Sequence, residues 1–151
     1  MVKNKIDISG DVRQILNSRL TGVLATESEE GPWTTLVSFC PSQDMHTLWF
    51  ATSRVTRKFS NLNSNNNVAI LFDTRTNSVD DFYDASALTA TGEAKELQGQ
   101  ERDQALEMMS EKLRFLSSFL KSPSVAIIQV KVRKYVLVTS FQEVRELKLY
   151  E

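Results

Sequence analysis

Three cationic side chains, Arg54, Arg57 and Lys58, lie within five positions of the sequence and offer its most specific chemistry. No acidic residue occurs from Met45 to Phe72, so no neighbour in the sequence neutralises them. Hydroxyl side chains are interleaved with the cations at Thr52, Ser53 and Thr56. The cluster follows an apolar strand-like segment and begins a helical pattern, where a cation opposes the helix macrodipole by about 0.3–1 kcal/mol. A bound phosphate would offset this cost, and the pattern therefore predicts a phosphate site, with solvated surface cations as the alternative.

The remaining inventory of reactive side chains is small. The 151 residues contain one Cys, Cys40, and one His, His46. This excludes a disulfide within the chain and zinc sites that need several Cys or His ligands. A nucleophile activated by histidine would have to use His46, which we expect in a surface turn, while we expect Cys40 to be a small buried hydrophobe. If the protein is an enzyme, a bound cofactor is the expected source of its chemistry.

Composition and charge narrow the function classes further. Hydrophobic residues make up 41% of the chain, enough for a packed core, and we expect residues 1–151 to form a single domain. With 18 basic and 19 acidic residues the formal net charge is −1, so no global field attracts nucleic acid. We see no signal peptide and no apolar segment long enough for a membrane span. These features predict a cytoplasmic protein with no nucleic-acid or membrane partner.

The apolar pattern predicts a mainly β (α+β) fold in which helices flank an antiparallel sheet closed into a small barrel. Period-two or continuous apolar segments predict strands over 21–26, 33–40, 47–52, 68–72 and 88–94, with a bulge or a close backbone approach at Gly92. Residues 124–140 predict either a strand pair or one long bent strand. Helical spacing predicts helices from Ser9 through Leu20, over 53–63 with Val55 on the apolar side, and over 100–121 with a division near Ser110. The segment 74–84 is expected to be a surface loop, and the charged tail 141–151 either to fray or to reach a partner.

Several of these segments, taken in order, resemble the FMN-binding split-barrel family typified by pyridoxamine 5'-phosphate oxidase. The similar stretches cover about half of the chain: residues 24–26, 31–39, 48–53, 56–62, 67–72 and 91–94. The resemblance implies a six-stranded antiparallel split β-barrel with flanking helices, a homodimer, and FMN bound in a cleft between the two subunits. It assigns the flavin phosphate to Thr52, Ser53, Arg57 and Lys58. It places Thr35, Val37 and Ser38 beside the isoalloxazine ring and Ala51 at the turn beneath the ribityl chain.

The C-terminus departs from the family pattern. The oxidase grips its pyridoxal substrate with a C-terminal segment rich in Arg, His and Trp, whereas residues 141–151 of this chain read FQEVRELKLYE. We therefore expect an FMN-binding protein of the family, a small flavin-dependent oxidoreductase for an unidentified small-molecule substrate, with no catalytic side chain and no metal assigned. The alternatives are a non-catalytic flavin-binding or electron-carrier module, a relative that binds F420 or heme, and a barrel that has lost its ligand. For heme, His46 is the one imidazole ligand that the sequence offers.

Overall fold

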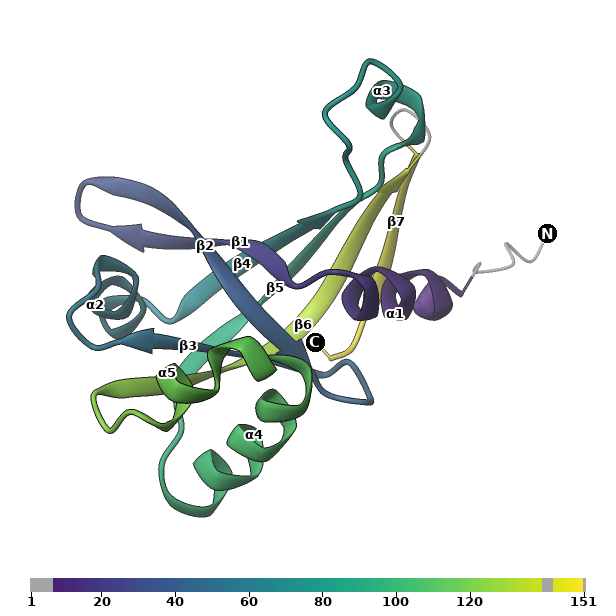
Figure 1. Cartoon of the computed structure of the whole chain (residues 1–151). Helices are drawn as coiled ribbons and strands as arrows, with labels where there is room; N and C mark the ends of the chain where they lie inside the picture. Colours follow the sequence, from purple (N-terminus) through teal and green to yellow (C-terminus); the bar gives the residue numbers. More distant parts are fainter. Residues whose placement is uncertain (1–6, 140–142, 151) are drawn as a thin grey trace.

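The computed structural model describes residues 7–139 and 143–150, and most of them form one antiparallel sheet. Its strands are β1 (Thr21–Ser28), β2 (Gly31–Pro41), β3 (Thr47–Ser53), β4 (Asn67–Asp73), β5 (Ala87–Glu96), β6 (Val125–Thr139) and β7 (Glu143–Lys148). The strand order is β3-β2-β1-β4-β5-β6-β7, and β3 also pairs with β6. This pairing closes six strands into a barrel and leaves β7 outside it, beside β6 (Figure 1). The expected six-stranded split-barrel fold is confirmed.

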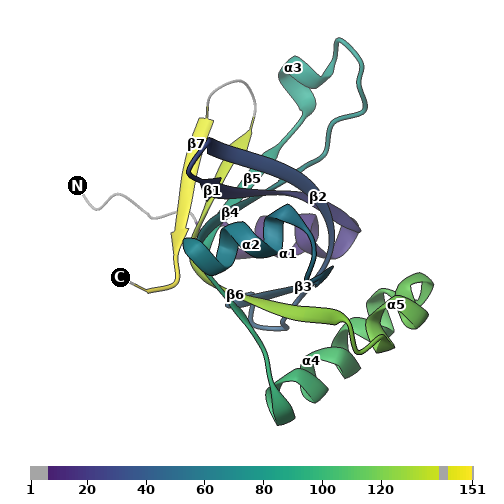
Figure 2. The same cartoon turned by 90° about the vertical axis from the view of Figure 1, so that its left-hand side faces the viewer.

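The helices lie around this barrel. They are α1 (Ser9–Ser18), α2 (Arg57–Ser64), the short α3 (Asp81–Asp84), α4 (Gly99–Lys112) and α5 (Ser117–Lys121), with a 3-10 turn over Arg114–Leu116. Viewed from the side where β3 ends, α2 lies across the end of the barrel (Figure 2). The pair α4 and α5 packs against the outer surface of β3 and β6. Among the described residues, no helix is both long and apolar enough to cross a membrane.

Two apolar clusters hold these layers together. The larger fills the barrel, and its members include Leu24, Phe39, Phe50, Ile70 and Phe72, each at most 1% exposed. α1 adds Val12, Ile15 and Leu16, as its apolar spacing predicts. The smaller cluster joins α4 and α5 to the outside of the sheet through Cys40, Leu97, Ala105, Met109, Leu113, Leu120, Val125 and Ile127. Cys40 is therefore a buried packing residue, as expected.

Five details differ from the sequence-based expectations or decide between their alternatives. Leu20 lies beyond the end of α1 and is 53% exposed, and Val55 lies before α2 and is 92% exposed, because Thr56 caps that helix. The long helical segment divides at Leu113 rather than Ser110. Residues 125–139 form one strand, which resolves the open alternative for this segment. Of the two alternatives for the tail, fraying is wrong for residues 143–148, because they form β7. Residues 140–142 and 151 lie outside the described residues.

The expected bulge in β5 is present and has a steric cause. The register between β5 and β6 shifts between Thr91 and Gly92. A Cβ atom on Gly92 would lie 2.2 Å from the main-chain oxygen of Lys131, so only glycine fits where the two backbones approach this closely. The bulge lets both strands bend around the barrel.

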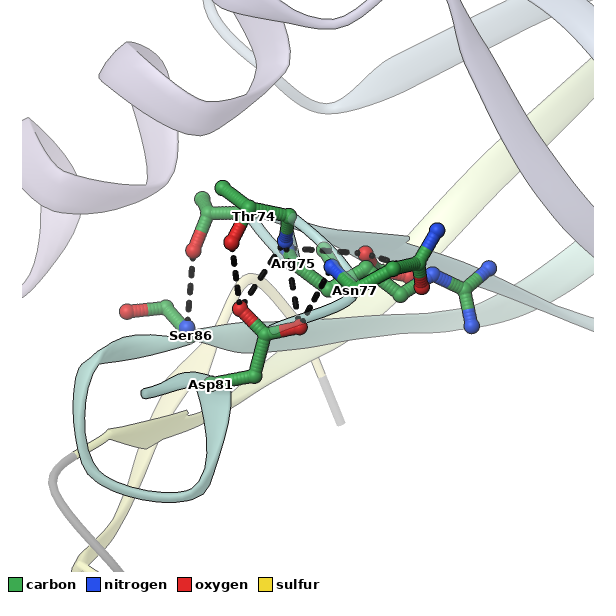
Figure 3. Close-up of polar contacts among 7 residues, drawn as sticks. Thr74, Arg75, Asn77, Asp81 and Ser86 are labelled. Carbon is green, nitrogen blue, oxygen red and sulfur yellow. Dashed lines mark hydrogen bonds and ion pairs between the residues drawn. The ribbon is translucent and has the colours of Figure 1, made fainter. Parts of the chain in front are cut away.

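The β4–β5 connection forms an arm that projects from one end of the barrel (Figure 1). The carboxylate of Asp81 accepts hydrogen bonds from Thr76 N at 2.9 Å, Thr76 Oγ1 at 3.0 Å and Asn77 N at 2.8 Å. At the base of the arm Ser86 N donates to Thr74 Oγ1 at 2.8 Å (Figure 3). The bonds to the carboxylate, led by that from the main chain of Thr76, lower the pKa of Asp81. The expected surface loop is therefore shaped by internal hydrogen bonds and contains the single turn of α3.

Lys112 connects two helices that lie far apart in the sequence. Its Nζ donates a hydrogen bond to Leu16 O near the end of α1, at 3.2 Å, and lies 3.8 Å from the centroid of the Phe39 ring. Burial lowers the pKa of Lys112 from 10.5 to about 8. The lysine thus holds α4 against α1, in surroundings that disfavour its charge.

We expect the burial of Lys112 to make the folded protein more stable as the pH rises into the alkaline range. Because the folded-state pKa of Lys112 is below its unfolded value, the unfolded chain binds more protons between about pH 8 and pH 10.5, and the free energy of unfolding rises over this range. Burial raises the pKa of Tyr135, which lowers stability only above its ordinary value of 10.0. Urea unfolding of wild type and Lys112→Met at pH 7.5 and 9.5 measures the difference. Because burial also lowers the pKa of Lys58 and raises that of Cys40, the difference between the two proteins isolates Lys112, and an increase of equal size in both would contradict this assignment.

Candidate functional site

The candidate site lies where β2 and β3 separate. They pair only at Phe39–Pro41 and Leu48–Phe50. Beyond this point β2 continues along β1 as far as Gly31, and β3 continues along β6 as far as Ser53. The stretch of β2 from Trp33 to Ser38 therefore has a strand neighbour on one side only, which leaves main-chain polar groups on the other side for α2 or a ligand. This opening is the split that the family resemblance implies.

A compact turn follows β3 at this opening. Thr56 Oγ1 donates to Ser53 O at 2.9 Å, and Thr52 Oγ1 lies 2.7 Å from Thr56 Oγ1. Thr52 is 1% exposed, so its hydroxyl is used inside the turn, whereas Ser53 is half-buried. Thr56 also accepts a hydrogen bond from Phe59 N at 3.4 Å and is the N-cap of α2. Of the predicted phosphate residues, Thr52 thus shapes the loop and Ser53 remains accessible.

The first turn of α2 presents donors without partners. The main-chain N–H groups of Arg57 and Lys58 have no acceptor in the described part of the chain, and this turn contains no acidic residue. Lys58 is half-buried and forms no hydrogen bond or ion pair with a described residue. Burial lowers the pKa of its ammonium group. A nearby anion would favour the charged form again, so these donors suit a phosphate.

Arg57 connects α2 to the hairpin between β1 and β2. Its guanidinium forms an ion pair with the carboxylate of Glu30 and lies 4.1 Å from the centroid of the Trp33 ring. Trp33 is 41% exposed and stands where β2 enters the split. Glu30 and Trp33 are outside the predicted set of cofactor residues. For Trp33 the sequence signal is an aromatic residue directly after the Gly31-Pro32 turn, whereas the sequence offers no such signal for Glu30.

Arg54 is used in a different way from its two neighbours. It forms an ion pair with Glu96 at 2.7 Å and donates to Pro123 O at 3.0 Å. The hydrogen bond from Arg54 to Glu96 raises the pKa of Arg54. Arg54 therefore connects the β3–α2 turn to the end of β5 and the start of β6. Of the three clustered cations, only Lys58 has no partner among the described residues.

The residues predicted beside the flavin ring lie along the separated part of β2. Thr35 and Ser38 are half-buried, and Val37 is 5% exposed within the barrel core. The methyl group of Ala51 packs instead against the cluster under α4 and α5. The structure thus places Thr35 on the separated stretch of β2, and Ser53 and the first turn of α2 at the end of β3, while the Val37 and Ala51 side chains serve packing.

The site can hold an anion but offers little for proton transfer. Its cations are Lys58, which has no partner within residues 7–139 and 143–150, and Arg57, which is already paired with Glu30. His46 is exposed before β3, at the opposite end of that strand from Ser53. Over the described residues, no group of three or more His, Cys, Asp and Glu side chains is arranged to hold a metal ion. The chemistry of the site is therefore binding and orientation.

A scan against protein-family models identifies the family. The model described as pyridoxamine 5'-phosphate oxidase matches residues 8–145, which include the whole barrel and the opening. The chain belongs to the pyridoxamine 5'-phosphate oxidase family. No curated protein sequence matches the chain significantly.

Solved structures share the split-barrel fold of the pyridoxamine 5'-phosphate oxidase family at low sequence identity. A heme binding protein from Mycobacterium smegmatis is 17% identical with a TM-score of 0.83, and the match covers 98% of this chain and 60% of that chain. The heme storage protein HutZ from Vibrio cholerae is 18% identical with a TM-score of 0.71, covering 95% of both chains. An FAD-binding protein from Mesorhizobium loti is 14% identical with a TM-score of 0.64, covering 85% of this chain and 92% of that chain. At these identities the similarity concerns the fold alone.

Proposed function

We propose that this protein binds FMN at the opening between β2 and β3, in a cleft completed by a second copy of the chain, and acts as a small flavin-dependent oxidoreductase. The observation that carries the proposal is Lys58, a half-buried cation that has no partner among the described residues and lies beside two main-chain N–H groups that have none there either. These donors match the oxygens of a phosphate monoester. Membership of the pyridoxamine 5'-phosphate oxidase family supports a flavin as the molecule that carries the phosphate.

In this proposal the residues of the opening bind and orient the cofactor. Lys58 and the start of α2 hold the phosphate, with the Ser53 hydroxyl available beside them. The unpaired main chain of β2 around Thr35 provides donors and acceptors along the ring. Bound FMN supplies hydride or electron transfer, and the protein contributes position and exclusion of water. No described side chain at the opening is required to move a proton.

The absorption spectrum of the purified protein, together with an FMN titration, tests the proposal. We expect flavin absorption on isolation, or saturation at one added FMN per subunit, in a particle of two subunits. Riboflavin, which lacks the phosphate, should bind more weakly. A colourless protein with no affinity for FMN would contradict the proposal. Reduction of the bound flavin by a nicotinamide cofactor, followed by reoxidation with an acceptor, separates an oxidoreductase from a passive flavin carrier.

Heme is the second candidate, because two structures with this fold are described as heme proteins. An axial histidine is a common ligand of heme iron. The single histidine, His46, lies just before the first residue of β3, whereas Lys58 and the main-chain donors of α2 come after the last residue of that strand. A seven-residue strand spans roughly 20 Å, so His46 is too far away to bind iron at the opening of its own chain. The same spectrum distinguishes the candidates, because heme gives a Soret band and flavin does not.

Glu30 should restrain FMN binding through its ion pair with Arg57. Glu30→Gln removes a negative charge near the phosphate and releases the guanidinium, and we expect FMN to bind about 2- to 5-fold more tightly, the scale of an exposed ion pair. Fluorescence titration with FMN at low and high salt measures the change, which should shrink as salt rises. The matched control is Glu29→Gln, an exposed neighbour without that contact. Equal effects of both substitutions would contradict the role of the pair.

A further inference from the structure

A second hollow lies between α4 and the outer surface of β3 and β6, away from the opening described above. It encloses about 400 Å³ and is lined by Gln43, Trp49, Glu101, Gln104, Ala105, Met108 and Gln129. Trp49 on β3 and Gln129 on β6 are directly paired across the two strands and form its floor. Residues of α4, the helix in the lower part of Figure 1, form its wall. The volume is sufficient for a small molecule.

The indole N–H of Trp49 has no hydrogen-bond partner. Its Nε1 is buried, and it is one of three buried side-chain nitrogen atoms without a partner in the described part of the chain. A buried donor without an acceptor costs folding free energy, and such groups in native proteins call for an explanation. Flexible glutamine and methionine side chains line the hollow beside this ring. Because the nitrogen itself is buried, a side chain of the lining has to move aside before an acceptor in the hollow can reach the indole N–H.

The three glutamines of the hollow are also without partners. Among the described residues, no hydrogen bond involves the side-chain amides of Gln43, Gln104 or Gln129. Each amide offers two donors and an acceptor. The one charged residue in the lining, Glu101, lies 3.6 Å from Lys95 in an ion pair. Apart from this exposed carboxylate, the polar groups of the hollow are neutral donors and acceptors.

We propose that this hollow binds a small, uncharged cyclic amide. The N–H and C=O of a ring amide lie side by side and can form two parallel hydrogen bonds with a glutamine side chain. A ring carbonyl can accept the Trp49 indole N–H, which otherwise has no acceptor. The thioether of Met108 and the methyl group of Ala105 suit the flat apolar face of such a ring. No charged group is needed, in agreement with the lining.

The indole N–H resonance of Trp49 provides a direct test. The chain has two tryptophans, and Trp33→Phe identifies the two indole signals in a ¹H–¹⁵N spectrum. Titration with 2-pyridone or uracil at millimolar concentrations should move the Trp49 signal downfield as it gains an acceptor. The 1-methyl derivative of 2-pyridone, which has no N–H to donate, should bind at least tenfold more weakly. An indole signal that does not respond to either probe would overturn the proposal.

Variants on α4 separate recognition from folding. Gln104→Met keeps the length of the side chain and removes the amide, and we expect at least a tenfold loss of affinity for 2-pyridone. Gln100→Met is the matched control, because Gln100 is exposed on the same helix outside the hollow. Equal affinities of the two variants would overturn the role of the amide. Lys58→Ala should bind 2-pyridone like the wild type, so this test is independent of FMN binding.

Discussion

Lys58→Ala should weaken FMN binding by about 10- to 100-fold, corresponding to the roughly 1.5–3 kcal/mol of a hydrogen bond to a charged group. The effect is expected to be large because Lys58 is the one clustered cation without a partner among the described residues. Removing it leaves the phosphate with main-chain donors and with an arginine that Glu30 already holds. Fluorescence titration of wild type and variant with FMN, in the same buffer, measures the loss.

The comparison with riboflavin makes this prediction specific. Riboflavin has no phosphate, so its affinity should be the same for wild type and Lys58→Ala. Lys121→Ala, on the exposed end of α5, is the matched control and should bind FMN normally. If the Lys58 variant loses FMN and riboflavin equally, the phosphate lies elsewhere. An unchanged circular dichroism spectrum confirms that the variant is folded.

Gly92→Ala should lower the free energy of unfolding by about 3 kcal/mol, in the upper part of the range for overpacked sites. The added Cβ would lie 2.2 Å from Lys131 O and 2.9 Å from Lys131 C, so the main chain of β5 or β6 has to move. These strands form the longest pairing in the barrel, and a shift there disturbs the register on both sides of the bulge. Urea unfolding followed by circular dichroism measures the decrease in the midpoint.

Gly10→Ala is the matched substitution for this experiment. Gly10 lies in α1, and a Cβ there would have no heavy atom within 4 Å. Alanine in a helix is more favourable than glycine by about 0.5–1 kcal/mol, so this variant should be as stable as the wild type or slightly more stable. A Gly92 variant that unfolds at the wild-type midpoint would show that the two backbones can separate without cost.

The barrel was predictable because its strands carry their own pattern. Buried and less buried positions alternate along β1, β3 and β4, and the bulge falls at a glycine inside a strand. β7 contains no buried position, and four of its six residues are charged, so its sequence carries little apolar pattern. Val55 has helical spacing to Phe59, but the Thr56 hydroxyl starts the helix after it. Patterns of side chains predict what a segment can bury, whereas a cap decides where it begins.

The candidate site was predictable only in part, for a different reason. The cations are adjacent in the sequence, but their partners are not: Glu30 lies 27 positions from Arg57, and Glu96 lies 42 positions from Arg54. Folding therefore pairs Arg54 and Arg57 with carboxylates, so that Lys58 is the one of the three cations left for a ligand among the described residues. Thr52 is a similar case, because the hydroxyl suits a phosphate in composition but is consumed inside its own turn. Which side chains keep no partner after folding, such as Lys58, cannot be predicted from their spacing in the sequence.

β7 has a consequence for behaviour in concentrated solution. Within the described residues it pairs with β6 alone, so one long side of this six-residue strand is an exposed edge that could recruit another strand. Short length and charged side chains oppose such edge-to-edge aggregation. β7 carries both signs of charge, at Glu143, Arg145, Glu146 and Lys148. The tail thus shields the Val-rich β6 from amyloid-like strand addition while adding little apolar edge of its own.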